Sequence, residues 1–445
     1  MNRRELLTSA GMAAGASAAW SSLLAPVRAL AAEAKTVRIK NIETFTIQLP
    51  ATDTEIQAGV QYRANVTRVE TESGVRGYSF DAISASRQGS RGASASGAGR
   101  GAAPGAPAAG AAGRGPGRGG MNPRARVSFQ EVRQALIGTD LFAMEDHLRK
   151  GLLSLSNQGG LEEALWDTIG KVAGQPVFRL LGGKQTSTPV YITAVWPGPN
   201  DQSQVPIKDQ AVYGRRLKEA GFNGLKIRIF RQDFMDDVDA VAGIIDACGP
   251  APGFKTMVDR TAANSGTVWN YATGLAAARA LEKVGCYWLE EPFARDDFET
   301  PARLAREVEM TITGGEGWHG LDAYREGLIH ETYDIMQPDL STCGGLLEMR
   351  KVSILCEAFH KPCIGHGSFG INVTGRIQAH AAWGAPLEEF ALATPPLLPQ
   401  EQWAPMVKIL NTKELFTFHN GEVQVPQSPG LGLDLNEEAI EHYKV

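Results

Sequence analysis

The sequence of 445 residues has few cysteines and no strong excess of either charge. Its five cysteines are an odd number and are scattered without a Cys-x-x-Cys pair, which argues against a zinc site and a disulfide framework. We interpret them as small apolar residues of the core. The net charge of −5 argues against nucleic acid or a membrane surface as the main partner. A hydrophobic content of 43% is typical of a globular protein.

Long apolar runs are also scarce, and the one at the N-terminus has the order of an export signal. The pair Arg3-Arg4 precedes an alanine-rich run that ends at about Leu24, and Ala29-Leu30-Ala31 offers a cleavage site. The arginine pair resembles a twin-arginine signal, with a general secretory signal or an uncleaved anchor as alternatives. We expect residues 1–31 to be removed on export to the periplasm, leaving a protein without stable membrane insertion.

A small α+β domain is predicted next, over residues 35–187. Residues 36–47 alternate with period two, as a half-buried strand does, and residues 66–72 and 75–80 repeat the pattern as an antiparallel sheet. Leu161–Val172 has the spacing of an amphipathic helix.

Residues 84–126 interrupt this domain with a different composition. Gly, Ala, Ser, Pro and Arg dominate, and almost no side chain there can join a core. This composition predicts a disordered, solvated insertion. The alternative is that its arginines bind an anionic partner.

From Pro189 onward, short strands alternate with helices, as in a (β/α)8 barrel of the α/β class. We assign residues 188–390 to the barrel and expect residues 391–445 to return to the first domain, through a strand-turn-strand at residues 415–425. The strand candidates are Val190–Ala194, Gly224–Ile229, Lys255–Val258, Cys286–Leu289, Met310–Thr313, Ile335–Met336, Pro362–Ile364 and Leu387–Ala391.

Polar residues stand where successive predicted strands end, at the face where barrel active sites are built. Any one of them could be a surface or structural residue, but a whole series at consecutive strand ends is hard to explain in that way. The series is Lys226, Asp259, Glu290, Glu316, Asp339, His366 and Glu389.

Three of these residues predict a metal site. Asp259, Glu290 and Glu316 would converge from adjacent strands, and three carboxylates repel one another unless a cation neutralises them. Ligation by oxygen alone suits a hard ion, Mg²⁺ before Mn²⁺. Each carboxylate taken alone could instead cap a helix or form a salt bridge.

Acid–base groups are predicted on both sides of this metal site. A lone buried histidine is usually structural, but Asp339 can fix the tautomer of His366 and raise its basicity. Lys226 would face His366 across the metal, which places one base on each side of a bound carboxylate.

The sequence resembles the mandelate racemase subgroup of the enolase superfamily over nearly all of the chain after the signal. The matching stretches are Lys226-Ile-Arg228, Val258-Asp259, Trp288-Leu-Glu290-Glu-Pro292, Gly314-Gly-Glu316, Gln337-Pro-Asp339, His366, Ala164-Leu-Trp-Asp167 through Leu180-Leu-Gly-Gly183, and Pro429-Gly-Leu-Gly432.

The resemblance implies a barrel closed by an α+β capping domain, one Mg²⁺ in each site, and assembly as a homo-oligomer. It also implies removal of the proton alpha to a substrate carboxylate, giving a metal-stabilised enediolate. Lys226 or Arg228 would help to stabilise the developing charge, and Glu389 would hydrogen-bond the substrate carboxylate, with Glu388 as the alternative in register.

A beta hydroxyl on the substrate would let His366 expel water, so the resemblance favours an acid-sugar dehydratase that gives a 2-keto-3-deoxy acid. The alternatives are a racemase or epimerase of a 2-hydroxy acid, and an exported carboxylate-binding protein without turnover. Arg228 replaces a lysine of mandelate racemase, which disfavours the racemase. The motifs do not name the acid sugar.

Overall fold

The computed structural model describes residues 36–51, 60–80, 84–87, 128–153, 160–194, 206–261, 268–367, 373–392 and 398–445. The predicted export signal at residues 1–31 lies outside these ranges, as does the predicted insertion beyond residue 87. Within the described ranges, no helix combines the length and apolar character needed to cross a membrane.

An antiparallel sheet forms the first part of the chain. Strand β1 (Ile39–Leu49) pairs with β2 (Val60–Thr71), which pairs with both β3 (Arg76–Phe80) and β4 (Ser84–Arg87). The prediction that the insertion begins at Ser84 is wrong for Ser84–Arg87, because these residues pair with Val60–Arg63. Backbone pairing needs no apolar side chain, so composition did not reveal this strand.

Helices α4 (Phe129–Leu136), α5 (Met144–Arg149), α6 (Leu161–Ala173) and α7 (Val177–Leu180) follow the sheet. Helix α6 lies against β3 at very close range. A Cβ added to Gly77 of β3 would stand 2.1 Å from Oγ1 of Thr168. Glycine at this position therefore allows the predicted amphipathic helix to pack directly against the sheet.

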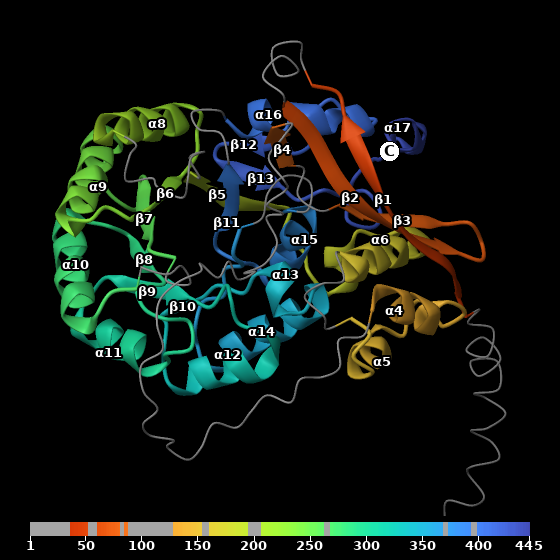
Figure 1. Cartoon of the computed structure of the whole chain (residues 1–445), viewed down its shortest axis with the longest axis horizontal. Coiled ribbons are helices and arrows are strands. Elements are labelled where there is room, and N and C mark those ends of the chain that lie inside the picture. The colour runs from red at the N-terminus through yellow and green to blue at the C-terminus, as the bar shows by residue number, and fades with distance from the viewer. Residues whose placement is uncertain are drawn as a thin grey trace, which may run out of the picture.

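The second part of the chain is a barrel of parallel strands inside a ring of helices (Figure 1). Its first strand, β5, pairs with both β6 and β11, so the first and last strands of the barrel are neighbours. The strands are β5 (Ser187–Ala194), β6 (Gly224–Arg228), β7 (Lys255–Asp259), β8 (Trp288–Glu290), β9 (Thr311–Gly314), β10 (Ile335–Met336) and β11 (Glu388–Leu392).

The helices alternate with these strands along the chain, as the sequence predicts for a (β/α)8 barrel. They are α8 (Ile207–Glu219), α9 (Phe234–Cys248), α10 (Tyr271–Val284), α11 (Glu299–Glu307), α12 (Gly320–Ile329), α13 (Leu340–Cys343), α14 (Leu346–Ala358) and α15 (Val373–Trp383).

The predicted strand at Pro362–Ile364 is only an isolated bridge between Cys363 and Met336. Met336 donates its N–H to the Pro362 carbonyl at 3.0 Å, and Ile364 donates to the Met336 carbonyl at 3.0 Å. Both bonds face β10. The described strand pairs include none between this segment and β11, so contacts other than strand pairing hold the segment on that side.

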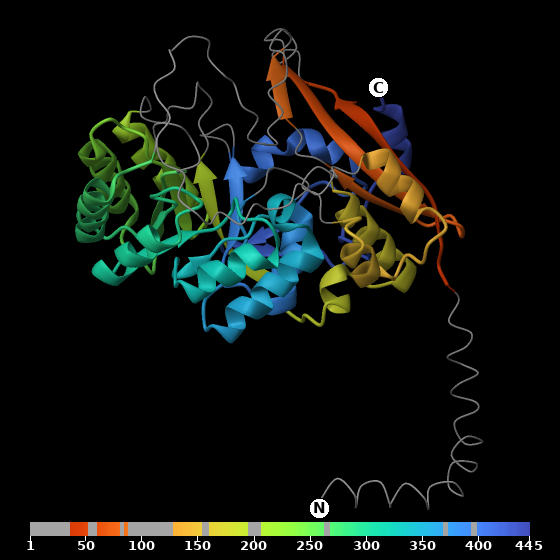
Figure 2. The same cartoon turned by 60° about the horizontal axis from the view of Figure 1, so that its bottom comes forward.

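The last part of the chain contains α16 (Pro399–Gln402), the 3-10 helix η4 (Ala404–Ile409), β12 (Phe418–His419), β13 (Glu422–Gln424) and α17 (Glu437–His442). The predicted return to the first domain is wrong for the hairpin, because β13 pairs with β5 of the barrel. The segment after α17 does lie on β1, where Gln48 donates to the Tyr443 carbonyl at 2.9 Å. Figures 1 and 2 both place α17 beside the orange sheet.

Asp167 of α6 joins these parts of the chain. Its Oδ2 accepts from the Tyr78 N–H of β3 at 2.8 Å, and its Oδ1 accepts from the Leu431 N–H at 2.8 Å. The side chain is buried and forms an ion pair with Lys171 at 2.6 Å. One carboxylate therefore satisfies donors from the sheet and from the C-terminal segment.

Replacement of Asp167 by alanine should lower the free energy of unfolding by about 3 kcal/mol or more, because two buried N–H groups lose their acceptors. Asp167→Asn keeps one acceptor oxygen and should fall between the alanine variant and the wild type. Urea unfolding followed by circular dichroism measures both. A loss below about 0.5 kcal/mol for the alanine variant would contradict this role.

Candidate active site

Lys226 lies inside the barrel between two carboxylates. Its Nζ stands 2.7 Å from Oε2 of Glu290 on β8 and 2.9 Å from Oε1 of Glu389 on β11, and all three side chains are fully buried. The hydroxyl of Thr193 on β5 also donates to Glu389. The neighbouring strands of the barrel thus bring together residues that are far apart in the sequence.

His366 lies between two other predicted residues. Its Nδ1 stands 2.8 Å from Oδ2 of Asp339, and its Nε2 stands 2.6 Å from Oε2 of Glu316. Asp339 is itself fixed, since its Oδ1 accepts from the Ser341 N–H at the start of α13 at 2.8 Å. Each ring nitrogen of His366 therefore faces a carboxylate, that of Asp339 at Nδ1 and that of Glu316 at Nε2. We call Lys226, Asp259, Glu290, Glu316, His366 and Glu389 the cluster.

The register of β11 decides between Glu388 and Glu389. Glu389 reaches Lys226 and accepts from the Gly367 N–H at 2.6 Å. Glu388 points to the helix side, where its Oε1 is 2.6 Å from Nε of Arg376. Glu389 is therefore the glutamate that reaches Lys226 inside the barrel.

The predicted metal ligands are brought together in part. Donor atoms of Glu290, Glu316 and His366 all lie within 4.8 Å of one another. Asp259 is opposite Glu290 in the strand register, but its Oδ1 and Oδ2 accept from the N–H and hydroxyl of Thr261 at 2.6 and 2.7 Å. Metal ligation by Asp259 stays a prediction.

The donor set fits a hard cation. Oε1 of Glu290 is buried and has no hydrogen-bond partner among the described residues. A buried carboxylate oxygen without a partner costs free energy, and a bound cation removes that cost. Because the neighbouring acidic donors are also oxygens, the residues present fit Mg²⁺.

The two carboxylates Glu290 and Glu316 have pKa values shifted in opposite directions. Burial raises the pKa of Glu290 to about 7, with Lys226 opposing the rise and Asp259 adding to it. Burial acts on Glu316 too, but His366 and Arg295 hold the pKa of Glu316 below its ordinary value. Glu290 is therefore the carboxylate whose ionised form gains most from an added cation.

Arg228 is on the same face of β6 as Lys226, two residues further along the strand. Its Nε is 3.5 Å from Oδ2 of Asp259, and its side chain is partly exposed. Arg228 thus borders the cluster from the solvent side.

Three further residues contact the cluster, although the sequence analysis gave none of them a role in the site. Gln337 donates to Oε2 of Glu290 at 3.0 Å, Thr193 donates to Glu389, and Arg295 forms ion pairs with Glu291 and Glu316. Thr193 and Gln337 stand at strand ends, so the criterion that found the others would have found them. Arg295 lies in a loop beyond its strand, and no periodic pattern marks it.

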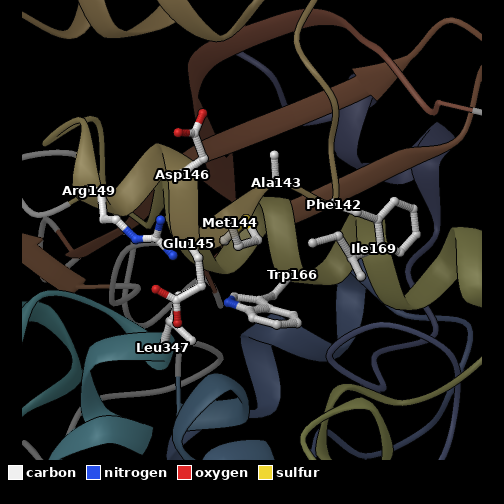
Figure 3. A pocket seen from close by; sticks show the side chains of 9 residues that line it. All are labelled: Phe142, Ala143, Met144, Glu145, Asp146, Arg149, Trp166, Ile169 and Leu347. Carbon is white, nitrogen blue, oxygen red and sulfur yellow. The ribbon is translucent and has the colours of Figure 1, made fainter. Parts of the chain in front are cut away.

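A pocket of about 410 Å³ lies elsewhere, between α5, α6 and the start of α14 (Figure 3). Its lining contains none of the predicted site residues. We therefore assign the site to the strand ends. The lining residues are Phe142, Ala143, Met144, Glu145, Asp146, Arg149, Trp166, Ile169 and Leu347.

Comparison with known proteins decides the family. A family model described as "Enolase C-terminal domain-like" matches residues 209–439, which is more than half of the chain. The chain belongs to the enolase superfamily. The predicted family, the barrel fold and the assignment to this group of enzymes are confirmed.

Two relatives and one solved structure of this superfamily show how near the chain lies to them. An arabinonate dehydratase of Saccharolobus solfataricus is 30% identical over 297 residues, covering 66% of this chain and 74% of that protein. A 3,6-anhydro-alpha-L-galactonate cycloisomerase of Streptomyces coelicolor is 29% identical over 254 residues, covering 55% and 67%. The crystal structure of a racemase from Streptomyces coelicolor A3(2) with bound magnesium has a TM-score of 0.64 at 23% identity, over 92% of this chain and 100% of that one.

Proposed function

We propose that this enolase-superfamily member removes the proton alpha to the carboxylate of an acid sugar and then eliminates the beta hydroxyl as water. The arrangement of Lys226 and His366 carries the proposal. Each contacts a different carboxylate of one cluster, Glu290 in the first case and Glu316 in the second. A substrate bound at that cluster would meet an acid–base group on each side.

Asp259, Glu290 and Glu316 would hold the Mg²⁺ ion. When bound, the ion supplies positive charge that offsets the negative charge developing on the substrate carboxylate. The pKa of Glu290, raised by burial, supports this assignment, because a cation beside it favours the ionised carboxylate.

The side chains of the cluster can move the protons that the reaction requires. The alpha C–H bond breaks, and its proton passes to one member of the Lys226–His366 pair. In the elimination the beta C–O bond breaks, His366 gives a proton to the departing hydroxyl, and water leaves. The resulting enol takes a proton at C3 to become the 2-keto-3-deoxy acid, so the net change is the loss of one water.

Two observations bear on the substrate and on the second candidate function. The arabinonate dehydratase relative supports an acid sugar as the substrate. Opposed groups at Lys226 and His366 would also serve a racemase or epimerase, in which one group removes the proton and the other returns it. The partner in both cases is a small carboxylate.

A screen of acid sugars with the Mg²⁺-loaded protein tests the proposal, with 2-keto acid formation as the readout. At least one acid sugar should give a 2-keto acid, and Lys226→Met should not form it. Solvent deuterium entering unreacted substrate without keto acid would favour the racemase. Absence of both reactions with a folded, Mg²⁺-loaded protein would overturn both candidates.

We also propose that the protein reaches the periplasm by the twin-arginine route, on the pattern around Arg3 and Arg4. Changing both arginines to lysine should leave the full-length precursor in the cytoplasm, as fractionation and blotting would show. Undiminished periplasmic protein from that variant would contradict this route.

A further inference from the structure

Among the described residues, the segment that carries His366 has strand pairing on one side only, and on the other side the Gly367 N–H donates to a side chain of β11, Oε2 of Glu389, at 2.6 Å. Its backbone bonds at Pro362 and Ile364 face β10, and the His366 N–H donates to the Pro338 carbonyl at 2.9 Å. On the side of β11, strand pairing does not continue in the described part of the barrel. The backbone that carries His366 is therefore paired with a strand on only one of its two sides.

Side chains of α15 supply the missing contacts. Trp383 donates its indole N–H to the Cys363 carbonyl at 3.3 Å, and the Gly365 N–H donates to Nε2 of His380 at 2.8 Å. Nη1 of Arg376 donates to the His366 carbonyl at 2.6 Å. We call Arg376, His380 and Trp383 the α15 clamp. Their spacing of four and three residues places them on one helix face.

Glu388 of β11 contacts two residues of the α15 clamp, Arg376 and His380. Its Oε1 is 2.6 Å from Nε of Arg376 and its Oε2 is 2.5 Å from Nδ1 of His380, all fully buried. Because the Gly365 N–H donates to Nε2 of His380, this nitrogen carries the lone pair and the ring proton sits on Nδ1, facing Glu388. This tautomer offers a lone pair to the Gly365 N–H and turns its own N–H toward Glu388.

The close approach also explains the residue at position 365. A Cβ added to Gly365 would stand 2.8 Å from Nε2 of His380 and 2.9 Å from Cδ of Arg376. Any larger residue would push the clamp away from the segment. The contact between the α15 clamp and this segment therefore depends on a glycine at position 365.

We propose that His380 is a positioning residue for His366, acting through the Gly365 N–H as part of the α15 clamp. The inference rests on the proposed function, in which His366 handles a proton. A displacement of the imidazole by about 1 Å can lower a rate by about 100-fold without any loss of catalytic groups. The clamp holds the histidine backbone where a β-strand pair would otherwise do so.

Two variants of His380 separate positioning from packing. His380→Phe keeps a ring beside Trp383, which now makes an edge contact with centroids 5.0 Å apart, but offers no acceptor to Gly365. His380→Gln loses the ring but can offer both an acceptor and a donor. If hydrogen bonding matters, the phenylalanine variant should be the impaired one; if only ring packing matters, the glutamine variant should be.

Amide hydrogen exchange of residues 363–367 reads the clamp without any catalysis. We expect faster exchange in His380→Phe and near-native exchange in His380→Gln. For the reaction, kcat should fall by roughly 100-fold in His380→Phe with KM nearly unchanged. Mg²⁺ affinity by calorimetry should stay at the wild-type value, because the predicted ligands lie on other strands. Gly365→Ala strains the same contact from the other partner and should also speed exchange.

Unchanged exchange at residues 363–367 in His380→Phe and Gly365→Ala would overturn the positioning role. So would a phenylalanine variant with wild-type kcat, or a glutamine variant that is the more impaired of the two. If His380→Phe does not fold, Gly365→Ala decides by the same two readouts. If the wild type turns over no acid sugar, the proposed function fails, and the exchange measurement still decides whether the clamp holds the segment.

Discussion

Replacing Glu290 with glutamine is expected to lower kcat by about 1,000-fold or more and to weaken Mg²⁺ binding strongly. The change keeps the shape of the side chain but removes its negative charge. In the wild type, Oε1 of Glu290 has no hydrogen-bond partner among the described residues, and burial raises the pKa of the carboxyl to about 7. Keto-acid formation and calorimetric titration with Mg²⁺ measure the two effects.

The matched control is Glu438→Gln, on the exposed face of α17. It makes the same chemical change far from the cluster, so kcat and Mg²⁺ affinity should stay at wild-type values. Exhaustive chelation of the wild type should reproduce the loss seen in Glu290→Gln, and added Mg²⁺ should restore activity. Turnover of Glu290→Gln within tenfold of the wild type, or full activity after chelation, would contradict the assigned metal site.

Replacing His366 with asparagine is expected to block elimination while Mg²⁺ stays bound. Losing a general acid costs roughly 100- to 10,000-fold in rate. The Nε2 of His366 contacts Glu316 at 2.6 Å, and His366, Glu290 and Glu316 offer atoms within 4.8 Å of one another. The geometry alone would therefore also allow His366 to be a ligand, and the two roles make different predictions for Mg²⁺ affinity.

Calorimetry decides between these roles. Unchanged Mg²⁺ affinity with lost elimination assigns His366 to proton transfer, whereas a large drop in affinity would make it a ligand. His442→Asn, near the C-terminus, is the matched control and should alter neither quantity. Unchanged dehydration in His366→Asn would assign the acid to another side chain.

The sequence predicted that several of these polar side chains would meet, because a barrel converts strand ends into neighbours, whereas their catalytic and metal-binding roles stay predictions. Lys226, Glu290 and Glu389 are far apart along the chain and meet within hydrogen-bond distance. The pairing of Asp339 with His366 followed from the same geometry. Once the alternation of strands and helices is recognised, the polar residue at each strand end is expected at the same face of the barrel.

The parts that sequence did not predict depend on contacts without a local pattern. Strand β4 pairs through its backbone although its sequence, Ser-Ala-Ser-Arg, has no large apolar residue. The segment before His366 reads as a strand, yet the side chains of α15 take the place of one neighbour. Arg295 reaches Glu316 from a loop, where neither period two nor period 3.6 applies.

The central claim is that Mg²⁺ and this cluster together remove the proton beside a substrate carboxylate. The most direct measurement follows the alpha C–H signals of an acid-sugar library by proton NMR in D₂O, with the protein and either Mg²⁺ or a chelator. With Mg²⁺, we predict loss of the alpha C–H signal from at least one acid sugar, by elimination or by exchange, and its persistence with the chelator. Persistence of every signal with the folded, Mg²⁺-loaded protein, or equal loss under chelation, would contradict the claim.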